Sequence, residues 1–168
     1  MIAAANPITT FQNADKARNF GLEFETAFEL GGGFFMNANY TYVDSKITLL
    51  PEQQTVQTSL ERPLAGQSNN LFNVTGEFAR GSFSVRALLN YVGDRISDVG
   101  SNGAPDIVEQ GRGTVDLVLL QRFGSRYNLR FSVENLTDAE LLFNQGDSRQ
   151  RSYKLGQTYG FSFGVDVF

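Results

Sequence analysis

Apolar and polar residues alternate along most of this chain. In residues 20–30, apolar side chains occupy nearly every second position, and Glu23, Glu25 and Glu29 lie among the positions between them. A repeat of two residues is typical of a β-strand with one oily and one polar face. Six further runs have the same pattern: 34–42, 72–78, 83–91, 115–122, 127–134 and 159–167. The pattern therefore predicts an all-β chain of about seven strands.

Three short connections test which side chains share a face. In an antiparallel hairpin, directly opposed residues point to the same face of the sheet. The opposed apolar pairs are expected to be Leu30 with Phe34, Phe78 with Phe83, and Phe123 with Tyr127. The middle hairpin then has a two-residue turn at Arg80–Gly81. Every one of these turns contains a glycine that can adopt a positive φ, so three short hairpins are predicted.

The other connections are long and rich in Gln, Ser, Asn, Asp and Gly. They cover residues 45–68, 96–112 and 138–152 and alternate with the short turns along the chain. An antiparallel meander then has every short turn at one end and every long loop at the other, as outer-membrane barrels do. Strands of ~9–11 residues span an outer membrane. We therefore expect an antiparallel up-and-down meander of about seven strands that is part of a larger transmembrane β-barrel.

The composition narrows the possible functions. The 168 residues include no cysteine and no histidine, which leaves no disulfide, no thiolate metal site and no His-based catalytic triad. Lys and Arg number 14 against 18 Asp and Glu, without the basic stripe of nucleic-acid-binding proteins. No apolar run is long enough for a transmembrane helix. We expect no enzyme activity, no metal or other cofactor, and no nucleic-acid partner.

The ends of the chain carry two further expectations. Residues 1–10 lack the charged segment and the long apolar run of a signal peptide. Seven strands are too few and odd in number, whereas bacterial single-chain barrels have an even number of about eight or more. We expect residues 1–10 to be the remnant of an extracellular loop and the export signal to be absent.

Five segments, in this order, resemble TonB-dependent outer-membrane receptors. They read N-A-x-K-A-x-x-x-G-x-E at 13–23, Y-T-Y-x-D-S at 40–45, R-P-L-x-G at 62–66, N-Y-x-G-x-R at 90–95 and E-N-L-T-D at 134–138. The final alternating strand completes the likeness, which covers nearly the whole chain. One departure is that Phe168 is out of phase with the apolar positions of the last run, which implies a bulge near the end or a different natural end.

The resemblance implies a role in import. Residues 1–168 would form a C-terminal segment of the barrel domain, without the plug domain. The complete receptor would lie in the bacterial outer membrane, in contact with its lipid, and take up a ferric siderophore, cobalamin or a similar ligand. Its other partners would be the rest of the barrel, the plug, and an inner-membrane energy-coupling protein reached through the missing N-terminal part. The segment alone would not be active.

Charged residues give the candidate sites. We expect Glu23, Glu25 and Glu29 to line a solvated lumen and to pair with Arg or Lys of neighbouring strands. Asp116 and Glu134 fall opposite each other, so a cation from Arg86 or Arg130 should lie nearby, because directly opposed like charges are destabilising. Ligand-binding candidates, chosen only by their place in the long connections, are Arg62, Arg95, Asp98, Asp106 and Arg149, with Glu109, Asp147 and Arg151 beside them.

Two other architectures stay open. A soluble lipocalin-like β-barrel or β-sandwich would enclose a small apolar ligand with its oily face, because a repeat of two does not say which face is inside. A complete small porin would need an export signal and an even number of strands.

Overall fold

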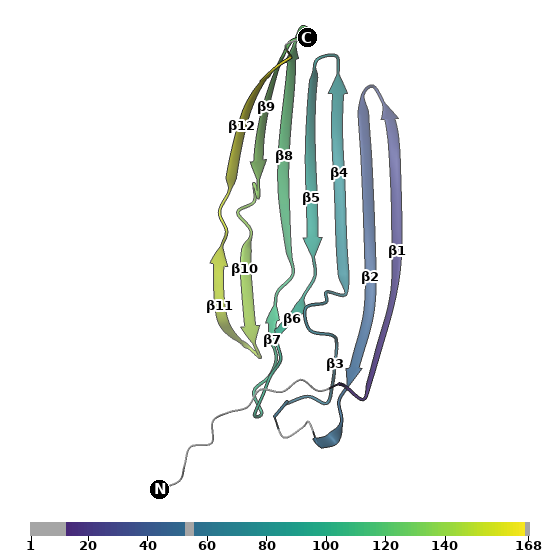
Figure 1. Cartoon of the computed structure of the whole chain (residues 1–168), viewed down its shortest axis with the longest axis vertical. Coiled ribbons are helices and arrows are strands. Elements are labelled where there is room, and N and C mark those ends of the chain that lie inside the picture. The colour runs from purple at the N-terminus through teal and green to yellow at the C-terminus, as the bar shows by residue number, and fades with distance from the viewer. Residues whose placement is uncertain (1–12, 53–55, 167–168) are drawn as a thin grey trace.

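Seven long strands form one antiparallel sheet in the computed structural model, which describes residues 13–52 and 56–166. Their order in the sheet is their order in the chain (Figure 1). The strands are β1 (Lys16–Gly31), β2 (Phe34–Thr48), β4 (Asn70–Arg80), β5 (Phe83–Val92), β8 (Arg112–Phe123), β9 (Tyr127–Glu134) and β12 (Thr158–Val165). The predicted all-β, up-and-down meander of seven strands is confirmed.

The strand register separates two faces along the sheet. Apolar positions align in rows across the strands. One row crosses β1, β2, β4 and β5, and each of its residues is opposite the next: Phe24, Tyr40, Phe72 and Tyr91. The next row pairs Glu25, Asn39, Asn73 and Asn90 in the same way. Because successive side chains of a strand point to opposite faces, the first row belongs to an apolar face and the second to a polar face.

Two of the three predicted hairpins have the expected register. Phe123 is opposite Tyr127, and Phe28 is opposite Met36. The first turn differs locally, because a bulge places Gly31 and not Leu30 opposite Phe34. Glycines 31 to 33 all have positive φ, and this run gives the backbone the freedom to insert the extra residue.

The predicted register of the middle hairpin is wrong by two residues. Phe78 lies opposite Val85, and Arg80 lies opposite Phe83, so the turn is Gly81–Ser82 and not Arg80–Gly81. Gly81 has a φ of 61° and is the first turn residue, which is the arrangement of a type II′ turn. A shift by two residues keeps each side chain on its face, so the assignment of faces is unaffected.

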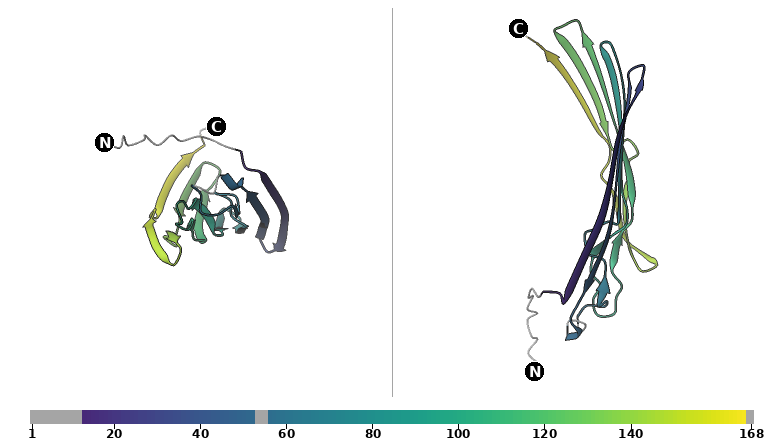
Figure 2. Two further views of the ribbon diagram at one scale, coloured as in Figure 1. Left: turned by 90° about the horizontal axis from the view of Figure 1, so that it is seen from below. Right: turned by 90° about the vertical axis from the view of Figure 1, so that its right-hand side faces the viewer.

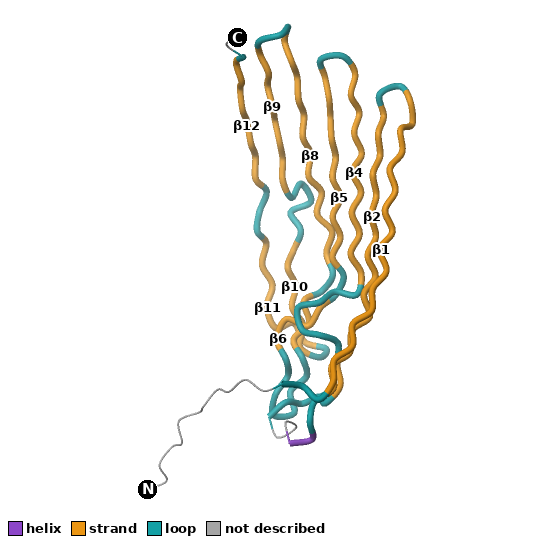
Figure 3. Tube along the Cα trace, turned by 45° about the vertical axis from the view of Figure 1, so that its right-hand side comes forward, coloured by secondary structure: helices purple, strands orange, loops and turns teal. Residues whose placement is uncertain are grey.

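The long connections are not the irregular loops that the sequence predicts. They contain β3 (Glu61–Arg62), β6 (Arg95–Asp98), β7 (Ile107–Glu109), β10 (Glu140–Gln145) and β11 (Ser148–Lys154). The last four form a second sheet in the order β11, β10, β7, β6. Figure 3 shows strand segments, coloured orange, at the end of the molecule that holds the long connections. Strand β2 also continues to Thr48, past the predicted boundary at residue 45.

The short turns gather at one end of the sheet and the long connections at the other (Figure 1). The sheet between them is twisted and curved (Figure 2). No other described part of the chain covers its apolar face: Phe24 is 63% exposed and Phe161 is 74% exposed. Among the described residues, the buried apolar side chains are Leu49, Ile96, Leu141 and Phe143 from the connections, with Val133 from β9. Within residues 13–52 and 56–166, no helix is long and apolar enough to cross a membrane.

Candidate functional site

Two hollows lie over the polar face of the sheet. One has a volume of about 500 Å³, and its lining includes Glu29, Phe35, Glu77, Arg86 and Leu88. The guanidinium of Arg86 donates to the Glu77 carboxylate across the β4–β5 pair, with Nε 2.8 Å from Oε2. A second hollow on the same face lies between Glu23 of β1 and Thr41 of β2. The polar face is therefore the concave, water-accessible side of this wall.

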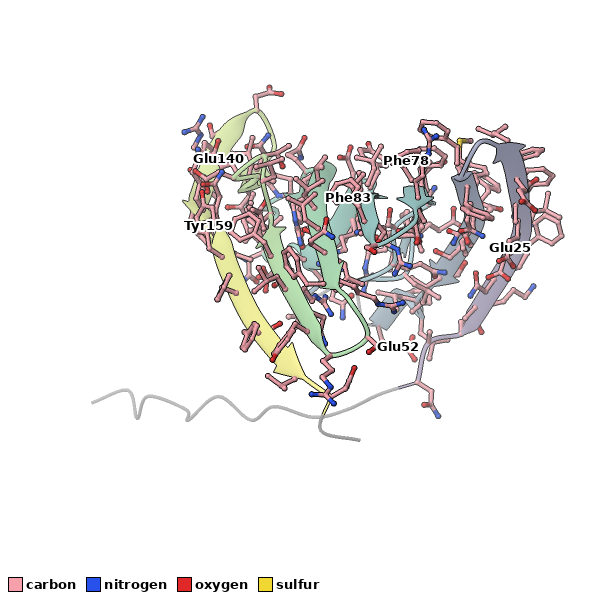
Figure 4. All side chains as sticks on the ribbon, turned by 90° about the horizontal axis from the view of Figure 1, so that it is seen from above. Glu25, Glu52, Phe78, Phe83, Glu140 and Tyr159 are labelled. Atoms are coloured by element: carbon pink, nitrogen blue, oxygen red, sulfur yellow. The ribbon has the colours of Figure 1, made fainter. Side chains whose placement is uncertain are left out.

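The glutamates of β1 do not have the basic partners that we expected. Across β2, Glu23 faces Thr41, Glu25 faces Asn39 and Glu29 faces Phe35. None of the three forms an ion pair with a described residue. Figure 4 shows Glu25 on β1 and Tyr159 on β12, at opposite edges of the sheet. Since β1 pairs only with β2 in the described part of the chain, its glutamates have a neighbouring strand on one side only.

The cation predicted beside Asp116 and Glu134 is also missing. Neither carboxylate forms an ion pair within the described residues, and Arg86 is engaged by Glu77. The predicted register is nevertheless correct, because Leu117 pairs with Val133. Asp116 is stabilised differently: its Oδ1 accepts a hydrogen bond from the backbone N–H of Asn135 at 2.8 Å. A backbone donor replaces the predicted cation, and sequence spacing gave no indication of it.

Asn135 holds together three segments at the end of β9. Its side-chain Nδ2 donates to the carbonyl of Gly156 at 2.8 Å, and its Oδ1 accepts from the N–H of Ala139 at 3.0 Å. Its φ of 53° is in the left-handed region, which Asn tolerates better than most residues. Asn135 therefore shapes the E-N-L-T-D segment, in agreement with the tendency of Asn and Asp to stabilise turns.

Arg95 belongs to a buried charge cluster in the second sheet. Glu109 is only 6% exposed and is opposite Arg95 across the β6–β7 pair. The Arg95 Nη2 lies 2.7 Å from the Glu109 Oε2, and Arg112 also forms an ion pair with this carboxylate. Two arginines thus compensate one buried carboxylate, as a buried charge requires. A lone Glu after Ile107 and Val108 was the sequence feature that could have indicated this cluster.

Asp98 is held by a residue from the next connection. Its Oδ2 accepts from the Ser97 hydroxyl at 2.9 Å and from the Arg151 guanidinium at 3.2 Å. The hydrogen bond from Ser97, and then that from Arg151, lower the pKa of the Asp98 carboxyl below its usual value. Arg151 also stacks over Phe143, with its guanidinium carbon 4.0 Å from the ring centroid. The sequence gave no sign of this Phe143 contact.

The other three ligand-binding candidates lie apart. Asp106 accepts from the backbone N–H of Gly100 at 2.6 Å and so shapes its own connection. Arg62 lies on β3, where its Nε and Nη1 are buried without a hydrogen-bond partner. Arg149 lies on the exposed β11 opposite Asn144. The structure therefore does not gather the five candidates into one pocket.

No group of three or more His, Cys, Asp or Glu side chains in the described part of the chain could hold a metal ion.

Residues 2–136 match the model of one protein family, described as TonB dependent receptor-like, beta-barrel. The match includes most of the chain and ends in the segment 134–138. No curated protein and no solved structure matches the chain.

Proposed function

The chain belongs to the TonB-dependent receptor-like β-barrel family, and on this premise we propose that it forms part of the wall of an energy-coupled uptake receptor for a ferric siderophore, cobalamin or a similar ligand. Receptors of this family lie in the bacterial outer membrane. The family is one of receptors and transporters and is not generally enzymatic. The remaining barrel strands, a plug domain and an inner-membrane coupling protein are the proposed partners.

The exposed apolar face is the observation that carries the proposal. It runs across all seven strands, from β1, where Phe24 is 63% exposed, to β12, where Phe161 is 74% exposed. Large contiguous apolar surfaces are rare on soluble monomers. On a membrane barrel the same face contacts lipid while the alternate residues face a polar lumen. The soluble alternative fits less well, because an oily face that enclosed a ligand would be the concave one, and here two hollows lie over the polar face.

The distribution of the connections supports an orientation. Outer-membrane barrels have short periplasmic turns and longer extracellular loops. The turns at Gly81–Ser82 and at residues 124–126 would therefore face the periplasm. The second sheet, β6, β7, β10 and β11, would face the outside of the cell, where a ligand arrives.

Lipid contact is tested with a single fluorescent residue, because the chain has no tryptophan. Phe161→Trp places the reporter on the apolar face, and Ser162→Trp places it on the polar face of the same strand. In bilayers with brominated lipid chains, we expect strong quenching of the first variant and little of the second. Acrylamide in the water should quench the second more strongly. Equal lipid quenching of both, or a chain that stays folded and monomeric without detergent, would contradict the proposal.

Ligand contact is proposed for Arg62 and Arg149 ahead of Arg95, Asp98 and Asp106. The first two have no ion-pair partner among the described residues, whereas Arg95 and Asp98 are paired. Arginine is well suited to bind carboxylate or phosphate groups. In cells that depend on the receptor, we expect Arg62→Gln to weaken uptake of an anionic ferric chelate without lowering receptor abundance. Asp106→Asn is the comparison variant, and an equal effect of both would contradict a specific role of Arg62.

A further inference from the structure

The second of the three long connections is hydrogen-bonded to both of the others at one end of the sheet. We call their described residues the first connection (49–52 and 56–69), the second connection (93–111) and the third connection (135–157). Each lies between two strands of the main sheet, and they are far apart in the sequence. Figure 1 shows them gathered beyond the same ends of the strands.

The second and third connections share a β-ladder. Phe143 pairs with Glu109, Asn144 with Val108 and Gln145 with Ile107. The ladder is extended by a bond from the N–H of Gln110 to the carbonyl of Leu142 at 2.8 Å. The side-chain amide of Gln145 also donates to the Pro105 carbonyl at 3.0 Å. The contact therefore involves the backbone of both connections and not only side chains at their tips.

The first and second connections are joined by separate bonds. The N–H of Thr58 donates to the carbonyl of Gly100 at 3.0 Å, and the N–H of Asn102 donates to the carbonyl of Val56 at 3.0 Å. The Thr58 hydroxyl donates to the Ala104 carbonyl at 2.6 Å. Nearer the sheet, the N–H of Gly66 donates to the carbonyl of Ile96 at 2.8 Å. The second connection is thus bonded on both sides.

Buried apolar side chains accompany these hydrogen bonds. Ile96 and Phe143 are 8% and 4% exposed, and they come from the second and third connections. Arg151 of the third connection contacts Phe143 and forms an ion pair with Asp98 of the second. Burial and backbone pairing together are the properties of segments that open cooperatively, whereas independent loops have few buried contacts.

We propose that the described parts of the three connections form one cooperative unit, the loop body, whose hydrogen bonds open together and not connection by connection. The proposal rests on the proposed function for placing the loop body on the extracellular side. There, a ligand that displaces any one connection would displace all three. The second connection is the element that transmits the movement, because it alone bonds to both others through the bonds described above.

A disulfide between the second and third connections tests the cooperativity. Ile107 and Gln145 are directly opposed in an antiparallel ladder, where the Cα separation suits a disulfide. The Ile107→Cys/Gln145→Cys variant is purified in detergent, and hydrogen exchange is followed at the amide of Thr58, which lies on the first connection. A cooperative body predicts exchange slower on the order of tenfold after oxidation. Unchanged exchange at Thr58, with slowing confined to β7 and β10, would overturn the proposal.

A loosening variant gives the converse measurement. Phe143→Ala removes a buried ring from the third connection, so exchange at Thr58 and Asn102 should become faster together. Lys154→Gln is the matched control, because it breaks only the pair with Asp138 inside the third connection. The single variant Ile107→Cys and the reduced double variant control for the substitutions themselves. Lipid quenching of Phe161→Trp reports on the proposed function separately, so the failure of one proposal is distinguishable from failure of the other.

Discussion

At the scale of single residues, chemical identity alone does not decide what a side chain does in this sheet. Leu88 and Leu89 are neighbours in β5, yet Leu88 faces Asp116 on the polar face and Leu89 faces Val115 on the apolar face. The alternation of a strand gives the two leucines different surroundings. Similarly, Glu23 and Glu109 are both carboxylates, but only Glu109 is buried between arginines.

Replacing Leu88 and replacing Leu89 with arginine should have very different effects on stability. Leu89→Arg places a charge on the apolar face, where it should cost about 2–4 kcal/mol if the position lies near the middle of the bilayer. Leu88→Arg should cost little, because the new cation faces Asp116, which has no basic partner among the described residues. The measurement is the free energy of unfolding in lipid bilayers by urea titration. Equal destabilisation by the two variants would show that the faces are assigned wrongly.

The ion pair between Asp98 and Arg151 predicts a pH dependence. The pKa of Asp98 is lowered in the folded chain, chiefly by its hydrogen bond from Ser97 and then by that from Arg151. A lowered folded-state pKa contributes stability above the unfolded value of 3.8, and this contribution is lost as the pH falls through the folded value. We expect amide exchange in β6 and β11 to become faster below about pH 4, after correction for intrinsic rates. Asp98→Asn should remove this pH dependence of amide exchange. If the variant keeps the pH dependence, another carboxyl group causes it.

At the scale of elements, the hairpin turns set the register. Gly33 approaches the next strand so closely that an added Cβ would be 2.1 Å from the carbonyl oxygen of Ala79. The same backbone segments are bonded, since the N–H of Ala79 donates to the Gly33 carbonyl at 2.8 Å. Turn glycines therefore fix the first hairpin and also its contact with β4.

Two glycine substitutions separate the cost of a steric clash from the cost of a positive φ. Gly32→Ala has an unfavourable positive φ of 63° but no near contact, so a cost of about 1–2 kcal/mol is expected. Gly33→Ala has a φ of 92° and the clash with Ala79, so its cost should be clearly larger. Urea unfolding in detergent, monitored by circular dichroism, measures both. Similar costs would mean that the β2–β4 contact relaxes around the new methyl group.

At the scale of the whole molecule, the sheet is open. Within the described residues, β1 and β12 each pair with one other strand of the main sheet, and their outer edges have unpaired backbone groups. In a bilayer, unpaired backbone groups are costly, which is why only closed barrels and helices span membranes. We therefore expect further strands to pair with both edges in the assembled receptor.

Hydrogen exchange measures whether the edges are paired. In the isolated chain in detergent, amides on the outer edges of β1 and β12 should exchange rapidly. In the assembled receptor the same amides should exchange slowly, because they donate to neighbouring strands. Amides of β4 and β5 provide the control, since these strands have neighbours on both sides in either sample. Slow exchange at both edges in the isolated chain would show that the sheet closes in another way.

Sequence patterns predicted the strands well and the connections poorly. Alternation in 20–30 or 83–91 is local, so each strand and its two faces could be assigned from neighbouring residues. The pairing of β7 with β10 depends on residues more than thirty positions apart, and both segments are too short for their residue pattern to show which strand they pair with. The Asn135 donor to Asp116 was missed for the same reason. Residues 1–10 and Phe168, about which the sequence gave expectations, lie outside the described residues.

The sequence by itself determined the seven strands, the two faces and the alternation of short and long connections. These features depend on the repeat of two and on turn glycines, both of which act between near neighbours in the chain. Tertiary structure alone decided the turn at Gly81–Ser82, the burial of Glu109 between Arg95 and Arg112, and the joining of three connections into one body. The physical reason is that such contacts depend on the relative positions of distant segments, which local residue patterns do not specify.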